Sequence, residues 1–292
     1  MSVAMPGPVM VAAGCGGAGA DLARFVDVAG LDIVTRTVTL DPVRAGSSGR
    51  VVESSGGVLV TDGADNPGLS AFLSAELPAL VRAGARPYVS IAGATPGELV
   101  DVVRRLAVTP GLSGIEVNLA ESAPAEQGLY APRELYQFGA LVTSLRREFT
   151  ADLPVLVKVR GGSERAADLA RTAHEAGANG VVLCTAQPAA LPDGTGARLC
   201  GPALAPVTAR ALREVAAACA DVPLIASGGV HDVPSARACL AAGAIAVQVG
   251  SALFTDPTLV DSLRADLTAP HAQHDPTPHD PTPHDPTRGV HP

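Results

Sequence analysis

The sequence predicts an α/β fold, a (β/α)₈ TIM barrel, and three observations support this prediction. Eight short apolar runs alternate along the chain with eight helical patterns. Each run is a nearly continuous apolar stretch of about five residues, as expected for strands that are buried on both faces of a parallel sheet. The last two runs end in glycine-rich turns, and barrels commonly bind phosphate after strands 7 and 8. A chain of 292 residues is long enough for one such barrel.

The predicted elements follow from the apolar runs and from apolar residues at helical spacing. The strands are expected at Val9–Ala13, Asp32–Thr37, Pro87–Ala92, Ile115–Leu119, Val155–Arg160, Gly180–Cys184, Leu224–Ser227 and Ala246–Val249. The helices are expected at Asp21–Ala29, Gly68–Ala83, Pro96–Ala107, Arg133–Phe149, Glu164–Ala176, Pro206–Cys219, Val233–Ala242 and Pro257–Leu267.

The stretch Val222–Leu253 carries the clearest functional signal. Its apolar runs, Leu224–Ala226 and Ala244–Val249, flank a helical pattern, which indicates a βαβ unit. The first run is followed by Ser227–Gly229 and the second by Gly250–Ser251. Glycine lets the backbone approach a ligand closely, and N–H groups at the start of a helix attract an anion. The turns therefore predict a phosphate site, and glycines that only make tight turns are the alternative.

Two segments depart from a minimal barrel. Asp41–Asn66 has the pattern of a hairpin inserted after strand 2, and Ala120–Pro132 is a longer loop after strand 4. Both leave the carboxyl ends of strands, where barrel active sites are built. Both are therefore candidate lids or substrate walls.

The chain ends in a repeat of His, Asp, Pro and Thr from His274 to Arg288. Proline at this density without apolar residues cannot build a core, so the tail is predicted to be disordered. We therefore divide the chain into a barrel, residues 1–269, and a tail, residues 270–292. A solvated tail is preferred over a metal-binding one, and no metal site is expected.

Composition limits the partners. The net charge is −8 and no block is rich in Lys or Arg, which argues against nucleic acid. No segment approaches the ~18 to 20 apolar residues of a membrane span. Five cysteines without CxxC spacing favour a reducing cytoplasm over a disulfide framework. The only lysine in the chain is Lys158, within the apolar strand PVLVKVR.

An ordered set of motifs carries a family resemblance. The motifs, from Gly7 to Leu253, are GPVMVAAGCGG, IVTRTVTL, DNPGL, GIEVNLA, PVLVKVR, CGPALAPV, IASGGV and AGAIAVQVGSAL. In these motifs the chain resembles the class 1 dihydroorotate dehydrogenase family, whose members are FMN-dependent barrels. The glycine turns alone would be a weak signal, whereas the ordered set is specific for the fold and the flavin site.

The resemblance implies which residues bind the cofactor FMN and the substrate. The implied cofactor-binding residues are Ala13, Gly14, Arg36, Thr37, Asn118, Lys158, Gly201, Gly228, Gly229, Gly250 and Ser251. The implied substrate-binding residues are Asn66, Gly68, Leu69, Asn118 and Thr185. A positive charge at Lys158 would stabilise anionic reduced flavin. The alternatives are a lysine that snorkels from a strand end and asparagines that only cap turns.

This chain departs from the family pattern around the substrate. Glu121 stands where the class 1 cysteine base would be, and Ala71, Ala123 and Thr185 replace substrate-binding asparagines. The implied catalytic residues are therefore Glu121 or Ser122 as the base, together with Lys158. A solvent-exposed loop carboxylate is the alternative for Glu121.

A further departure is Arg36, which replaces a lysine of the family and keeps its charge but presents a planar fork. Removing hydrogen bonds to a polar pyrimidine costs affinity, which puts the ancestral substrate in question.

The resulting hypothesis is an FMN-dependent oxidoreductase that acts on a CH–CH bond of dihydroorotate or a related small cyclic substrate. Three alternatives stay open: a flavin ene-reductase or dehydrogenase with another substrate, a non-catalytic flavin-binding homologue, and a phosphate-binding barrel without flavin. The resemblance also implies a homodimer and allows an electron-transfer partner subunit.

Overall fold

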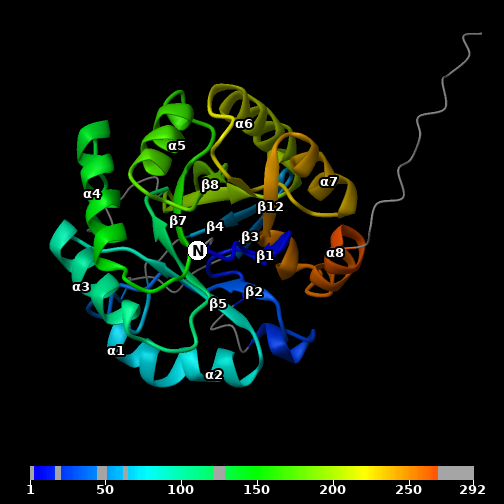
Figure 1. Cartoon of the computed structure of the whole chain (residues 1–292). Coiled ribbons are helices and arrows are strands. Elements are labelled where there is room, and N and C mark those ends of the chain that lie inside the picture. Colours follow the sequence, from blue (N-terminus) through cyan, green and yellow to red (C-terminus); the bar gives the residue numbers. More distant parts are fainter. Residues whose placement is uncertain (1–2, 17–20, 45–50, 62–64, 121–128, 269–292) are drawn as a thin grey trace, which may run out of the picture.

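The computed structural model describes residues 3–16, 21–44, 51–61, 65–120 and 129–268. Eight parallel strands close into a barrel in the order β1-β12-β11-β8-β7-β6-β5-β2, which confirms the predicted fold (Figure 1). The barrel strands are β1 (Val9–Val11), β2 (Asp32–Val34), β5 (Arg86–Ile91), β6 (Gly114–Asn118), β7 (Val155–Arg160), β8 (Gly180–Cys184), β11 (Leu224–Ser227) and β12 (Ala244–Val249).

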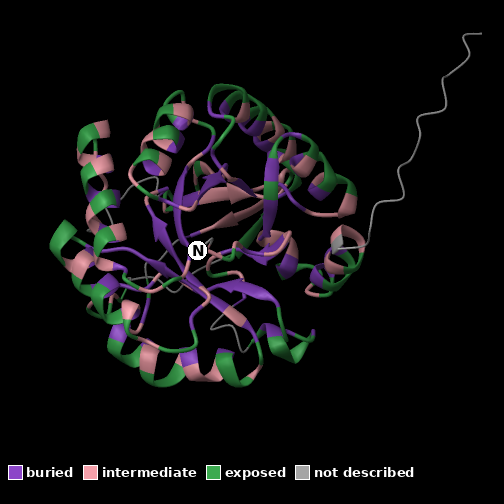
Figure 2. Ribbon diagram, viewed as in Figure 1, coloured by how far each residue is buried: buried purple, intermediate pink, exposed green. Residues whose placement is uncertain are grey.

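The helices form a ring around the barrel, with their buried faces toward the strands and their exposed faces outward (Figure 2). They are α1 (Leu69–Ala71), a π-helical turn η2 (Phe72–Glu76), α2 (Leu77–Arg82), α3 (Pro96–Ala107), α4 (Leu135–Glu148), α5 (Ala166–Glu175), α6 (Ala205–Ala218), α7 (Val233–Ala241) and α8 (Leu259–Thr268). Two helix starts are capped by side chains: Thr95 accepts from Glu98 N at 3.2 Å, and Asp232 forms a capping box with Ser235. No helix in the described ranges is long and apolar enough to cross a membrane.

The predicted helix at Asp21–Ala29 is wrong. Only a short 3₁₀ helix, η1 (Leu22–Arg24), forms there. The Asp27 side chain accepts from Ala29 N at 2.9 Å and so forms a turn instead of continuing the helix. Gly30 then has a φ of 68° and leads the chain into β2.

A small antiparallel sheet adjoins the barrel. The hairpin predicted after strand 2 is confirmed as β3 (Val51–Ser54) and β4 (Gly57–Val60). A second hairpin, which the sequence analysis did not predict, consists of β9 (Gln187–Ala190) and β10 (Gly196–Cys200). The two hairpins pair through β4 and β10 in the order β3-β4-β10-β9. The loop at 120–132 lies mostly outside the described residues, as does the tail from 269 onward.

The lower interior of the barrel is an apolar layer. It is built from Met10, Val34, Tyr88, Leu156, Val182, Ile225 and Ala246. On β6 the matching position is Gly114, where a Cβ would lie 2.6 Å from the Tyr88 ring. The absent side chain on β6 thus makes room for tyrosine, and ligand space begins above this layer.

Candidate functional site

A pocket of about 410 Å³ opens at the carboxyl ends of the barrel strands. This volume lies within the range of roughly 300 to 1,000 Å³ that is usual for cofactor and substrate sites. Side chains from β4 and β10 line it too, so the small sheet forms one of its walls. The pocket brings together all eleven residues that the resemblance implies for cofactor binding.

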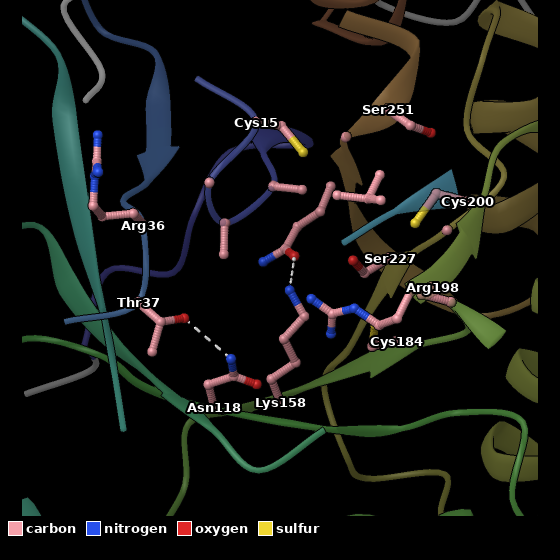
Figure 3. A pocket seen from close by; sticks show the side chains of 18 of the residues that line it. Cys15, Arg36, Thr37, Asn118, Lys158, Cys184, Arg198, Cys200, Ser227 and Ser251 are labelled. Atoms are coloured by element: carbon pink, nitrogen blue, oxygen red, sulfur yellow. Dashed lines mark hydrogen bonds between the residues drawn. The ribbon is translucent and has the colours of Figure 1, made fainter. Parts of the chain in front are cut away.

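Lys158 lies buried on β7 at the floor of the pocket. Its Nζ donates to Glu116 Oε1 at 3.4 Å and to Gln248 Oε1 at 3.3 Å. Gln248 Nε2 donates in turn to Glu116 Oε2 at 2.5 Å. Burial is the largest single effect and lowers the pKa of the Lys158 ammonium, but Glu116 and Cys184 together outweigh it and hold this pKa above its ordinary value. The site therefore contains a fixed positive charge (Figure 3).

The alternation of side chains along a strand places these groups. Lys158 and Gln248 come two residues after Leu156 and Ala246, so they point into the barrel one layer above the apolar layer. Glu116 occupies the corresponding position on β6, and all three side chains are buried. A polar layer therefore covers the apolar one and faces the pocket.

Two glycines end β11 in conformations that favour glycine. The φ angle is 135° at Gly228 and 72° at Gly229. A Cβ at Gly228 would collide with the Thr185 hydroxyl, and one at Gly229 with the backbone of Ala205. Thr185 Oγ1 lies 2.5 Å from Thr208 Oγ1, which also lies 2.9 Å from Gly228 O. The turn is thus fixed from behind while its backbone lines the pocket.

The second turn follows β12, where the 3₁₀ helix η4 (Ser251–Phe254) begins directly after Gly250. Beside it, β1 continues into Ala12, Ala13 and Gly14, which line the pocket with small side chains only. A wall of small residues can lie against a flat ring, and two glycine-rich turns can surround an oxyanion with N–H groups.

These features fit FMN. The turns at Gly228–Gly229 and Gly250–Ser251 would hold its phosphate, and the wall at Ala13–Gly14 would lie against its ring system. Lys158 would stand near the ring as a cation.

Thr37 and Asn118 meet across the pocket. Asn118 Nδ2 donates to Thr37 Oγ1 at 3.1 Å (Figure 3), and Thr37 Oγ1 lies 2.9 Å from Ser90 Oγ. Arg36 also lines the pocket, and its Nε lies 3.5 Å from Glu76 Oε2. The structure therefore places all three predicted polar residues at the same site.

The predicted substrate residues are placed less uniformly. Asn66 lines the pocket, but its Oδ1 accepts from Thr39 N at 3.2 Å and Gly68 N at 2.9 Å, so it also holds the local turn. Gly68 and Leu69 do not line the pocket, and Leu69 is fully buried in the core at the start of α1. Thr185 is buried against Thr208 rather than facing the pocket.

Two of the predicted catalytic residues, Glu121 and Ser122, lie outside the described residues. Their place relative to the pocket stays a prediction. The loop that carries them follows β6, and Leu129 at the other end of this loop lines the pocket.

Sequence reasoning missed several residues that line the pocket. They include Cys184, Arg198 and Gln248. Gln248 could have been predicted, because it lies two residues before Gly250, at the end of a strand, and so faces the same side of the sheet. No local signal marked Arg198, because the hairpin that carries it lacks an alternating apolar pattern.

Comparisons with known proteins agree with the geometry. A family model described as dihydroorotate dehydrogenase matches residues 1–270. Similar curated proteins include the catalytic subunits of dihydroorotate dehydrogenase B (NAD(+)) from Bacillus caldolyticus, 33% identical over 92% of this chain and 90% of that protein, and from Listeria monocytogenes, 31% identical over 91% and 92%. The subunit from Desulforudis audaxviator is 33% identical over 89% of this chain and 87% of its own. The barrel, the glycine turns and these matches together show that the chain belongs to the dihydroorotate dehydrogenase family of oxidoreductases.

Proposed function

We propose that this protein is an FMN-dependent oxidoreductase that converts the CH–CH bond of dihydroorotate, or of a related small cyclic substrate, to C=C. The observation that carries the proposal is the shared pocket: a buried, charge-paired Lys158 lies in the same cavity as the glycine turns after β11 and β12. A phosphate site alone would suit many barrels. A buried cation at the floor of the same pocket suits a cofactor that gains negative charge on reduction.

The flavin supplies the acceptor for a hydride. Lys158 would hold negative charge at the ring, because its ammonium is fixed by Glu116 and Gln248 and needs no rearrangement during the reaction. Asn118, which Thr37 orients, would donate or accept hydrogen bonds near the same ring. The wall at Ala12–Gly14 would exclude water from one side.

A base must remove the proton from the carbon next to the one that gives up the hydride, so that both substrate hydrogens are accounted for. We propose Glu121 for this role, with Ser122 as the second candidate. A carboxylate can act as the base when a closed loop desolvates it and raises its pKa.

The decisive experiment begins with the chromophore. Heat-released cofactor from the purified protein should be FMN by chromatography, rather than FAD or riboflavin. The holoprotein should then form orotate from dihydroorotate with an artificial electron acceptor, and Glu121→Gln should slow this turnover by about 10² to 10⁴-fold if it is the base. FMN without orotate formation would leave the cofactor in place and reject the substrate. A protein that holds no flavin and cannot be reconstituted would reject the proposal.

An electron-transfer partner and a homodimer complete the proposal. Relatives that carry the words "catalytic subunit" in their names support a separate partner subunit for this chain. The five cysteines, all described and none in a disulfide, fit a reducing cytoplasmic compartment.

A further inference from the structure

The unpredicted hairpin brings an arginine into the pocket. Arg198 lies on β10 between two partners, Val60 of β4 and Pro188 of β9, so its backbone is fixed on both sides. Arg198 and Cys200 alternate along the strand and both line the pocket, whereas Leu199 between them does not. The Arg198 side chain therefore enters the pocket from the small sheet, whereas Lys158 enters it from the barrel.

The guanidinium of Arg198 lies close to Lys158 at the centre of the pocket (Figure 3). Its charge acts on Lys158 and opposes the effect of Glu116 on the pKa of that lysine. Among the described side chains that line the pocket, three are cationic, Arg36, Lys158 and Arg198, and one is anionic, Asp65. Most of the charged side chains that line the pocket are therefore positive, which favours an anionic ligand.

The positions that the family resemblance implies for substrate binding offer few side-chain amides to the pocket. Ala71 is not a pocket residue and carries no amide, and Thr185 is turned toward Thr208. Asn66 uses its Oδ1 to hold the turn at Gly68. The pocket therefore contains fewer of these amide groups than the family resemblance implies, and it contains a planar cation, Arg198.

We propose that Arg198 anchors the anionic group of the substrate, a planar carboxylate carried on a small ring, and so determines substrate specificity in this chain. The inference rests on the proposed function and adds to it the group that is recognised. A guanidinium can donate two parallel hydrogen bonds to a carboxylate, which gives both orientation and affinity. An anchor on the small sheet would orient the substrate ring against the cofactor ring that Lys158 and the wall at Ala12–Gly14 accommodate.

The test uses the FMN-loaded full-length chain and two probes, orotate and its uncharged carboxamide, orotamide, in isothermal titration calorimetry. We expect the wild type to prefer orotate. Arg198→Gln should weaken orotate binding by about 10- to 100-fold and change orotamide binding by less than about 3-fold. The orotate affinity of Arg198→Lys should lie between those of the wild type and Arg198→Gln, because lysine keeps the positive charge but cannot donate two parallel hydrogen bonds. Arg210→Gln, on the exposed face of α6, removes the same charge far from the pocket and should match the wild type.

Each other outcome contradicts the inference in a recognisable way. If Arg198→Gln keeps the wild-type preference for orotate, the anchor lies elsewhere, while dihydroorotate turnover by the wild type would leave the proposed function standing. If the variant loses FMN and its probe preference is unchanged, Arg198 serves the cofactor instead. If the wild type is loaded with FMN and binds neither probe, both the substrate class and the anchor are wrong. Melting curves and Arg198→Lys separate a loss of binding from a loss of fold.

Discussion

Replacing Glu116 by Gln tests the buried charge pair on which the account of the site depends. Glutamine preserves the shape and can still accept from Gln248, but it leaves the Lys158 ammonium buried without its counter-charge. Breaking a buried pair in this way costs about 3 to 5 kcal/mol. Both contacts of Lys158, at 3.3 and 3.4 Å, are longer than ideal charged hydrogen bonds, so we take the lower end, ~3 kcal/mol of unfolding free energy.

The assay is thermal unfolding followed by circular dichroism. A loss of ~3 kcal/mol should lower the melting temperature by roughly 6 to 12 °C in a domain of this size. Glu214→Gln is the matched control, because the Arg210–Glu214 pair on α6 is exposed and solvent screens it. An E116Q variant as stable as E214Q would refute the reasoning.

The same variant has a defined pH dependence. In the wild type the pKa of Lys158 is raised by folding, so its stabilisation is fully present below the unfolded value of ~10.4 and is lost only as pH rises through the higher folded value. In E116Q the charge of Glu116 no longer opposes burial, so the pKa of Lys158 should fall and the variant should gain stability as the ammonium loses its proton. The difference in unfolding free energy between the wild type and E116Q should therefore become smaller as pH rises toward ~10. A difference that stays constant with pH would contradict the pairing of Lys158 with Glu116.

Three further predictions concern the pocket. Gly229→Ala should lose most bound FMN and some stability, because φ at this residue is 72° and a Cβ would collide with the backbone of Ala205. Gly250→Ala should lose less FMN, because the nearest atom to its Cβ would lie 3.3 Å away. Flavin absorbance per mole of protein measures the FMN content of both variants. Thr208→Val should lower the free energy of unfolding by ~1 to 3 kcal/mol and Thr208→Ser by much less, because only valine removes the hydroxyl that contacts Thr185 Oγ1 and Gly228 O. Urea titration measures both free energies. Lys158→Met should slow flavin reduction by dihydroorotate about 10²-fold at matched FMN content, and an unchanged stopped-flow rate would exclude the electrostatic role.

The barrel could be predicted because its strands are short apolar runs separated by clear helical patterns. Periodicity and turn chemistry are local, and in this fold the local signals agree with the tertiary structure. The glycine turns after β11 and β12 were predictable for the same reason, since strained backbone requires glycine wherever it occurs. The failure at Asp21–Ala29 came from the Asp27 turn, which competes with a helix only a few residues long.

The rest of the site depends on partners distant in sequence. The residues of β10 form a strand because β4 and β9 pair with them, so no pattern within the segment identifies it. Lys158 stood out as the only lysine, but its counter-charge comes from β6 and its second contact from β12. These groups come together only through the order and register of the strands. Local patterns in one sequence do not reveal either.

The most direct test of the central claim is an anaerobic titration of the purified holoprotein with dihydroorotate, followed at the flavin band at ~450 nm. The account predicts that the band bleaches and that orotate appears in proportion. A flavin-loaded protein whose band stays unchanged under dihydroorotate, yet bleaches with dithionite, would contradict it.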